Sequence, residues 1–396
     1  MKRPSSHAAV RTGRRSTLLI LLLGACASDA GTDPAAASGG DVALAGAPRA
    51  ATMALAGSSL FVNPSSPAQR QAELWRSSRA DDAAQMNKIA SQPVAIWLGE
   101  WSGDVRGAVS SAIAAAAGRM SVFVAYNLPG RDCGGYSAGG VSAGAYRTWI
   151  RDVAAGLGGA PAVVVLEPDA LAGMDCLSAE AQEERVALIG DAVDVLKAAG
   201  ATVYVDAGHA LWQPVEVMAE RLARAGIERA DGFALNVSNF VATDVTTTYG
   251  EALSQRVGGK HFVIDVSRNG LGATPDAQWC NPSERALGVN PTTVTGNSLV
   301  DAYLWVKVPG ESDGSCNGGP SAGTWWPEYA LGLAQRQPVT AVTLLPPPAP
   351  APTPPPPADS TPNPTPQPTP EPTPDPDPPD PNPPPDRGDA APGPLR

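Results

Sequence analysis

Short apolar runs that end in polar side chains recur along the middle of the chain. The clearest run covers residues 162–166, where five apolar and mostly β-branched residues suffice for one buried strand. Glu167, Pro168 and Asp169 follow directly, and the proline stops the hydrogen-bond ladder of the strand from continuing. The pattern therefore predicts two carboxylates at the point where a buried strand reaches the surface.

Five further runs repeat this pattern. They cover residues 121–125, 202–205, 232–235, 261–264 and 303–306, and are followed by Tyr126, Asp206, Asn236, Asp265 and Lys307, respectively. Between them the composition and periodicity predict helices over residues 105–118, 179–199 and 215–225, with Ser178 as an N-cap. Such alternation is typical of a βα barrel or a doubly wound sheet. We expect an α/β fold, a distorted (β/α) barrel of the TIM-like type, because barrels carry polar groups at the carboxyl ends of their strands.

A serine hydrolase is one alternative that the sequence raises. Residues 140–144 read Gly-Val-Ser-Ala-Gly and match a nucleophile elbow, which requires a strand directly before the serine. Ser142 follows a glycine-rich loop instead, so this interpretation is disfavoured. The chain has three histidines, no phosphate loop, no dinucleotide fingerprint and a net charge of −11. We therefore expect no metal, no cofactor and no nucleic-acid partner.

Four segments resemble one family of sugar-cleaving enzymes. Residues 124–134 read Val-Ala-Tyr-Asn-Leu-Pro-Gly-Arg-Asp-Cys-Gly, residues 163–172 read Val-Val-Val-Leu-Glu-Pro-Asp-Ala-Leu-Ala, residues 204–212 read Tyr-Val-Asp-Ala-Gly-His-Ala-Leu-Trp, and residues 304–314 read Leu-Trp-Val-Lys-Val-Pro-Gly-Glu-Ser-Asp-Gly. In order and spacing they resemble the cellulases of glycoside hydrolase family 6, over roughly residues 58–336. The resemblance implies hydrolysis of β-1,4-glucosidic bonds with inversion at the anomeric carbon.

Inverting hydrolysis requires an acid that protonates the leaving oxygen and a base that acts on water from the opposite face. Asp169 is the candidate acid, since burial or a neighbouring carboxylate can keep it protonated. By resemblance, Asp132 perturbs that acid, and Asp313 serves as the base, directly or through a chain of waters. Tyr126 helps to distort the sugar ring, and Asp206 supports the electrostatics.

Glucan binding requires flat aromatic faces and a few fixed polar groups. The resemblance assigns Trp97, Trp212 and Trp305 to sugar subsites, and His209, Asn236, Lys307 and Glu311 to hydrogen bonds with sugar hydroxyls. It leaves the other six tryptophans (Trp75, Trp101, Trp149, Trp279, Trp325 and Trp326) to the core or the surface. We expect Asp265 to have a structural role as a partner of Arg268. An ion pair between Lys307 and Glu311 is the structural alternative for those two residues.

Five cysteines are an odd number for an exported protein. Cys26 ends a segment that resembles a lipoprotein box, which leaves Cys133, Cys176, Cys280 and Cys316 as an even set with three possible pairings. The resemblance selects Cys133–Cys176 and Cys280–Cys316. An ordinary signal peptide with an incidental cysteine is the alternative for Cys26.

The two ends of the chain differ in composition from the middle. Basic residues followed by a short apolar run predict a lipoprotein-type signal peptide over residues 1–25, and residues 26–55 read as a flexible tether. Residues 346–396 contain 25 of the 42 prolines and read as an extended linker. We expect the catalytic domain over residues 56–338, in a monomer that is secreted or lipid-anchored at the cell envelope.

The sequence favours an endo-acting enzyme on cellulose or related β-glucans. Only 35 residues lie between Cys280 and Cys316, which is short for the loops that roof the cleft in the exo-acting members of the family. An exo-acting cellobiohydrolase is the first alternative. A non-catalytic glycan-binding surface lipoprotein is the second, and the joint presence of Asp132, Asp169 and Asp313 disfavours it.

Overall fold

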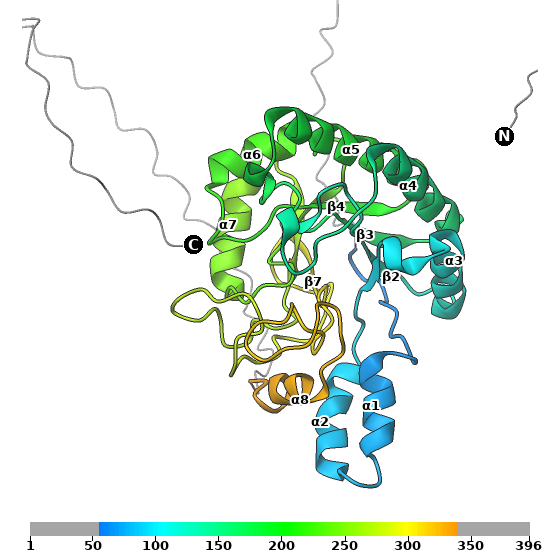
Figure 1. Ribbon diagram of the computed structural model, residues 1–396, viewed down its shortest axis with the longest axis vertical. Coiled ribbons are helices and arrows are strands. Elements are labelled where there is room, and N and C mark those ends of the chain that lie inside the picture. The colour runs from blue at the N-terminus through cyan, green and yellow to red at the C-terminus, as the bar shows by residue number, and fades with distance from the viewer. Residues whose placement is uncertain (1–54, 339–396) are drawn as a thin grey trace, which may run out of the picture. The chain divides into compact units, whose positions relative to one another are not determined.

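The computed structural model describes residues 55–338, and its centre is one sheet of seven parallel strands. The strands are β1 (Ile96–Leu98), β2 (Ser121–Ala125), β3 (Ala162–Leu166), β4 (Thr202–Asp206), β5 (Gly232–Leu235), β6 (His261–Asp265) and β7 (Val300–Leu304). They lie side by side in the order in which they occur along the chain. The helices α3 (Val105–Ala116), α4 (Ala143–Leu157), α5 (Ala179–Ala198), α6 (Val215–Arg224) and α7 (Thr243–Arg256) form an arc outside the sheet (Figure 1).

The sheet curls until its two ends meet. Val94, which precedes β1, forms a parallel bridge with Trp305, which follows β7. The amide of Ala95 donates to the carbonyl of Trp305 at 3.0 Å and supports this closure. The predicted (β/α) barrel is therefore confirmed, with seven strands and a narrow seam between the first and the last.

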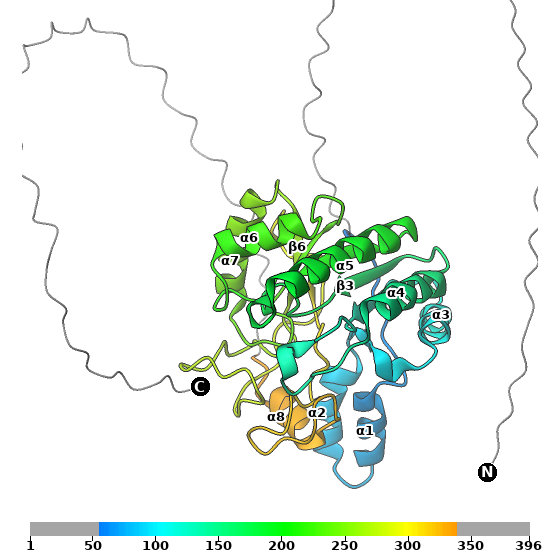
Figure 2. The ribbon, with the colours of Figure 1, turned by 45° about the horizontal axis from the view of Figure 1, so that its top comes forward.

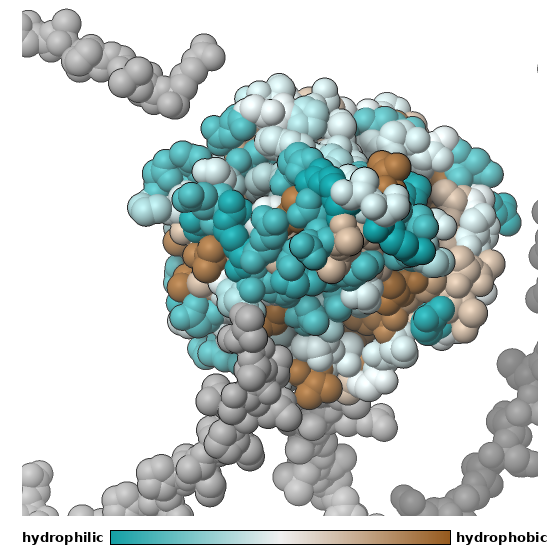
Figure 3. All heavy atoms as spheres, turned by 90° about the horizontal axis from the view of Figure 1, so that it is seen from below, coloured by the Kyte–Doolittle hydropathy of each residue, from teal (hydrophilic) through white to brown (hydrophobic). Residues whose placement is uncertain are grey.

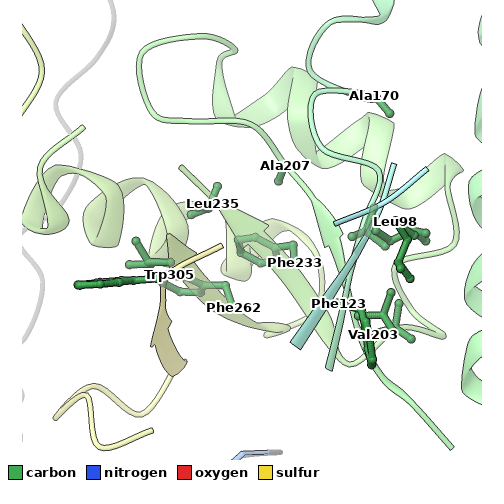
Figure 4. Packing of buried hydrophobic residues seen from close by; sticks show 14 of the residues in the cluster. Leu98, Phe123, Ala170, Val203, Ala207, Phe233, Leu235, Phe262 and Trp305 are labelled. Carbon is green, nitrogen blue, oxygen red and sulfur yellow. The ribbon is translucent and has the colours of Figure 1, made fainter. Parts of the chain in front are cut away.

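Strands β2, β3, β5 and β6 are buried on both of their faces. On β3, Val163 and Val165 belong to the cluster inside the curled sheet, whereas Val164 and Leu166 belong to the cluster between the sheet and the helices. Figure 4 shows part of this outer cluster, with Phe233 and Phe262 from neighbouring strands side by side. Double burial explains the continuous apolar runs in the sequence, since parallel strands covered on both faces do not alternate with polar residues.

Three of the helices were predicted with nearly correct bounds. α3, α5 and α6 end within two residues of the predicted ends, and Ser178 caps α5 by accepting a hydrogen bond from the amide of Ala181 at 3.3 Å. The sequence analysis did not predict five helices that are present: α1 (Pro67–Trp75), α2 (Ala80–Ala90), α4, α7 and α8 (Pro327–Gln335). The helices α1, α2 and α8 lie together at one end of the domain in both ribbon views (Figures 1 and 2).

The last strand lies earlier in the chain than predicted. The sequence indicated residues 303–306, whereas β7 pairs with β6 over Val300–Leu304. Beyond Leu304 the partners change, because the carbonyl of Trp305 accepts from Ala95 and the amide of Lys307 donates to the side chain of Asp265. The hydrogen-bond ladder therefore ends before the apolar run does.

Ser142 is the N-cap of α4 and not a nucleophile on an elbow. Its hydroxyl oxygen accepts a hydrogen bond from the amide of Ala145 at 3.4 Å, and no strand directly precedes it. The structure thus agrees with the sequence analysis in disfavouring a serine hydrolase.

A buried polar cluster fills the barrel at the end opposite Asp206. Asp301 on β7 accepts a hydrogen bond from the hydroxyl of Tyr204 at 2.6 Å, and its second oxygen lies 2.8 Å from Nδ1 of His261. Gly232 lies between them in the sheet register, where a Cβ atom would come within 2.0 Å of the carbonyl oxygen of His261. Only glycine leaves room for this cluster.

The surface in Figure 3 is mostly hydrophilic, with a few separate hydrophobic patches. Among residues 55–338, no helix is both long enough and apolar enough to cross a membrane.

Candidate active site

The carboxyl ends of β3 and β4 are joined through Asp206. One carboxylate oxygen of Asp206 accepts from the amide of Asp169 at 2.9 Å and from that of Gly208 at 3.0 Å. Asp169 has a φ of +67°, a left-handed conformation that is uncommon for a residue with a side chain. The buried Asp206 carboxylate therefore stabilises the turn that presents Asp169.

The surroundings of Asp169 favour its protonated form. The residue is half-buried, but protein atoms surround its carboxyl group, and this burial raises its pKa well above the usual value. The negative charges of Asp206, Asp132 and Asp313 raise it further, whereas the positive charge of Lys307 opposes them. The predicted acid thus lies among the carboxylates that were predicted to perturb it.

Asp206 is also shifted toward the neutral form. Burial raises its pKa to about 7, while the two amide hydrogen bonds oppose the rise and the charge of Asp265 adds to it. Its second oxygen is buried and has no hydrogen-bond partner among the described residues. Asp206 can therefore share a proton with its surroundings near neutral pH.

The loop after β2 presents Asp132. The residue has a φ of +57°, and its carboxylate accepts from the amide of Ser137 at 2.7 Å. The next residue, Cys133, forms a disulfide with Cys176 in the loop that follows Asp169. The predicted Cys133–Cys176 pairing is confirmed, and it ties the Asp132 loop to the Asp169 loop.

Tyr126 directly follows β2 and packs against Trp97 and Arg131. Burial raises its pKa, and the charges of Asp169 and Asp132 raise it further. Its ring meets that of Trp97 edge to face at 5.3 Å, and the guanidinium of Arg131 lies 4.7 Å from the ring centroid. The Trp97 indole donates to the carbonyl of Val306 at 2.8 Å. These contacts fix the two rings relative to each other.

Asp313 is held as a carboxylate. It is buried, which raises its pKa, but Arg268 at 2.8 Å, Lys307 at 3.4 Å and the amide of Asn281 at 3.0 Å outweigh that effect. The result is a pKa below the usual value. The neighbouring Cys280–Cys316 disulfide, also as predicted, braces this segment.

Among residues 55–338, neither the expected Asp265–Arg268 pair nor the Lys307–Glu311 pair, which was the alternative for those two residues, is present. Asp265 does not pair with Arg268, which binds Asp313; instead it accepts hydrogen bonds from backbone amides, so its structural role is confirmed. Lys307 contacts Asp313 and, at 3.4 Å, the carbonyl of Ser312, and no ion pair with Glu311 occurs among residues 55–338. Glu311 is half-buried, and burial raises its pKa while Lys307 opposes the rise.

His209 and Trp212 form an accessible pair near the carboxyl end of β4. Trp212 is 41% exposed, and its ring lies 5.5 Å from that of His209. Burial lowers the pKa of His209 to about 4, so the ring is neutral, and its Nδ1 accepts from the amide of Leu211. The proton of the neutral ring therefore lies on Nε2, which can donate to a hydroxyl group.

Trp305 and Asn236 do not face an open site. Trp305 is 1% exposed, lies beside Phe262 in the outer cluster (Figure 4), and donates from its indole to Val289. Asn236 is fully buried, and its amide is bound to Val241 and Asp265. The predicted contacts of these two side chains with sugar are corrected, because neither presents a polar or aromatic surface outside the core.

Two aromatic residues that the sequence analysis did not assign to the site lie at its edge. Tyr136 and Trp279 are about half-exposed, and their ring centroids are 6.2 Å apart. Tyr136 packs against the backbone beside Asp313, since a Cβ atom on Gly314 would lie 2.3 Å from its ring. Trp279 directly precedes Cys280, which was the one signal in the sequence that it belongs near the site.

The described domain matches one family throughout its length. Residues 55–337 match the model of glycosyl hydrolases family 6. The chain is 47% identical to endoglucanase A of Cellulomonas fimi over 70% of this chain and 61% of that protein, and 41% identical to endoglucanase 1 of Streptomyces halstedii over 68% and 86%. It therefore spans less than two thirds of the Cellulomonas protein.

Solved structures agree with the sequence relatives. The endoglucanase Cel6 from Mycobacterium tuberculosis, in complex with methyl-cellobiosyl-4-deoxy-4-thio-β-D-cellobioside, is 47% identical, with a TM-score of 0.68 over 71% of this chain and 98% of that chain. The catalytic core of the cellobiohydrolase Cel6A from Chaetomium thermophilum is 26% identical, with a TM-score of 0.61 over 71% and 98%. This chain belongs to glycosyl hydrolases family 6.

Proposed function

We propose that the chain hydrolyses internal β-1,4-glucosidic bonds of cellulose or a related β-glucan with inversion. The observation that carries this proposal is the pairing of opposite protonation states in one site. Burial and like charges keep Asp169 protonated, whereas Arg268 and Lys307 keep Asp313 ionised. An acid and a base with separated pKa values are what an inverting glycosidase needs.

In the proposed reaction Asp169 donates its proton to the glycosidic oxygen as the bond from that oxygen to the anomeric carbon breaks. A water molecule attacks this carbon from the opposite face, and Asp313 accepts the proton of the water, directly or through further water. Asp132 and Asp206 keep the proton on Asp169 before the substrate reacts. The products are a new non-reducing end and an α-anomeric reducing end.

The aromatic residues are proposed to bind the glucan. Trp97 and Tyr126 form a fixed wall, and Trp212, Tyr136 and Trp279 offer exposed ring surface. Sugar rings stack on such surfaces, and neutral His209, Lys307 and Glu311 supply hydrogen-bonding groups. The cello-oligosaccharide analogue bound in the Mycobacterium tuberculosis relative supports a ligand of this class.

Endo-action is favoured over exo-action by the relatives. The proteins named endoglucanases are 41% to 47% identical to this chain, whereas a probable 1,4-β-D-glucan cellobiohydrolase C from Aspergillus terreus is 32% identical. The segment between Cys280 and Cys316 has only 35 residues and includes both β7 and Asp313, and Asn281 at its start accepts a hydrogen bond from the amide of Asp313.

The test of this proposal uses fresh products. Proton NMR should show that the α-anomer forms first, and the viscosity of a soluble cellulose derivative should fall steeply for each reducing end released. First formation of the β-anomer would contradict inversion. Cellobiose release with little loss of viscosity would indicate exo-action, and glucan binding without hydrolysis would indicate a binding protein.

The rate of hydrolysis is expected to depend on pH through these two groups. Because Asp169 must be protonated, activity falls as the pH rises through its raised pKa; because Asp313 must be ionised, activity falls as the pH drops through its lowered pKa. Lys307 opposes the first shift and contributes to the second. Lys307→Met should therefore move both limbs of the profile of kcat/KM to higher pH, whereas unmoved limbs would contradict this account of the site.

Export is the remaining part of the proposal. The two disulfides support an oxidising compartment. The predicted signal peptide, lipidation at Cys26, tether and Pro-rich segment lie outside the described residues and stay predictions, as do the domain limits of 56–338 and the monomeric state.

A further inference from the structure

We propose that Glu167 and Arg185 are positioning residues that together clamp the Asp132 loop to the Asp169 loop. The two loops are called here the β2 loop (residues 126–142) and the β3 loop (residues 167–178). This inference deepens the proposed function, on which it rests, because it concerns how the candidate acid is placed relative to Asp132.

Glu167 holds the first part of the β2 loop. Both of its carboxylate oxygens accept from the amide of Asn127, at 3.0 and 3.1 Å, and one also accepts from the amide of Leu128 at 3.3 Å. Its side chain is 1% exposed, and its φ of +52° is left-handed. Such a conformation persists in a residue with a side chain only where the surrounding contacts fix it.

Arg185 holds the next part of the same β2 loop. It comes from α5, is 4% exposed, and donates to the carbonyls of Pro129 and Gly130, both at 2.9 Å. The same guanidinium donates to the carbonyl of Ala170, in the β3 loop, at 3.2 Å. One side chain therefore joins the backbones of both loops.

Together the two side chains bind four successive residues. Glu167 accepts from residues 127 and 128, Arg185 donates to residues 129 and 130, and Asp132 follows two residues later. Within the β3 loop, Glu167 lies two residues before Asp169 and Ala170 lies one residue after it. The clamp thus fixes the chain on both sides of the acid and immediately ahead of Asp132.

Both side chains are buried, and burial raises the pKa of Glu167 to about 7 against the hydrogen bonds from Asn127 and Leu128. Burial lowers the pKa of Arg185, and the negative charge of Glu167 opposes that change. Among residues 55–338, no carboxylate lies within ion-pair distance of the Arg185 guanidinium, so its hydrogen bonds go to backbone carbonyls. Burying a guanidinium without a carboxylate partner costs free energy of folding, which argues against a role in stability alone. The backbone positions that Arg185 fixes are those next to the proposed acid, Asp169, and just ahead of Asp132.

The test compares two substrates that differ in their need for an acid. A cello-oligosaccharide has an alcohol leaving group, which must receive a proton as the bond breaks. In 2,4-dinitrophenyl β-cellobioside, the phenolate leaves with the electron pair and needs none. Arg185→Met should lower kcat on the oligosaccharide by about 10²-fold, with a much smaller loss on the aryl glycoside. A role in stability alone would lower both rates in the same proportion.

Arg221 offers a matched control. It donates from α6 to the carbonyls of Leu171 and Ala172, so it holds the β3 loop without reaching the β2 loop. Arg221→Met should therefore change the two substrate rates by the same factor. Equal losses in Arg185→Met, or the same selective loss in Arg221→Met, would overturn the clamp.

Hydrogen exchange tests the clamp without turnover. In Arg185→Met, peptides from the β2 loop and from the β3 loop should both exchange faster, and in Arg221→Met only those from the β3 loop. Unchanged exchange in the β2 loop would overturn the inference. If the unsubstituted protein hydrolysed neither substrate, the proposed function would be wrong. Hydrogen exchange in the two loops would still test the clamp.

A double-mutant cycle tests whether the pair acts as a unit. Glu167→Gln replaces an oxygen that accepts backbone hydrogen bonds with an amide nitrogen that cannot. In the double variant, the loss of oligosaccharide rate, expressed as an activation free energy, should be smaller than the sum of the two single losses. Full additivity would show that the two side chains act independently. If Arg185→Met does not fold, Arg185→Lys, which keeps the charge with fewer donors in a fixed geometry, should show the same selectivity with a smaller loss.

Discussion

Replacing Asp169 with asparagine is expected to lower hydrolysis of cello-oligosaccharides by roughly 10²- to 10⁴-fold, the usual contribution of a general acid. Asparagine has nearly the same shape but no acidic proton, so the leaving oxygen departs without protonation. Binding should remain, because sugar contacts are assigned to aromatic and polar groups around the acid. Reducing-sugar assays measure the rate, and calorimetry with an oligosaccharide measures Kd.

Asp175→Asn is the control for this substitution. Asp175 lies on the same loop, but its side chain is 63% exposed and pairs with Arg221. Arg221 is only 11% exposed, but without Asp175 it keeps its hydrogen bonds to the carbonyls of Leu171 and Ala172, so the variant should keep nearly full activity. If Asp169→Asn kept most of its rate, or lost binding and rate together, Asp169 would not be the acid.

Six of the seven strands and the candidate acid could be predicted because their signals are local, whereas the three-residue strand β1 was not predicted. Five apolar residues followed by Glu167-Pro168-Asp169 mark both a strand and its end, and β3 occupies the predicted residues. The parallel sheet then brings Asp169 and Asp206 together, because both follow neighbouring strands. No knowledge of the side-chain packing was needed for either inference.

The direction in which a side chain points could not be predicted in the same way. Strands buried on both faces show no alternation of polar and apolar residues, so nothing in the sequence told whether Trp305 faces the interior or the helices. Trp279 shows the opposite error, because it was left to the core or the surface but is half-exposed at the edge of the site. It lies in an irregular segment, where no periodicity indicates which way a side chain points.

Partners that are distant in the sequence were also beyond prediction. Arg268 is 45 residues from Asp313, and Arg185 is 55 residues from Gly130, yet each pair shares a hydrogen bond. Periodicity places Arg185 on α5 but cannot show that its guanidinium is buried against two loops. Candidate catalytic groups could therefore be named from the sequence, whereas the contacts that set their pKa values and positions required the fold.

Removing the Cys133–Cys176 disulfide is expected to damage both stability and catalysis. The two cysteines are 43 residues apart, and the entropy of the loop that they close corresponds to about 4 kcal/mol in the free energy of unfolding. In a domain of this size, that loss lowers Tm on the order of 10 °C. Because the bond ties the loop of Asp132 to that of Asp169, the Cys133→Ser/Cys176→Ser variant should also hydrolyse more slowly at temperatures where it stays folded.

The second disulfide separates these two effects. Cys280 and Cys316 are 36 residues apart, so their removal should cost nearly the same stability. The segment that bears Asp313 keeps other contacts, however, because Asn281 accepts from the amide of Asp313 at 2.8 Å and donates to the carbonyl of Gly314 at 2.7 Å. Thermal unfolding of the two double-serine variants should therefore give similar Tm values, whereas kcat well below Tm should fall more in Cys133→Ser/Cys176→Ser. Equal losses of kcat would show that the Cys133–Cys176 bond has no role in catalysis beyond the stability it provides.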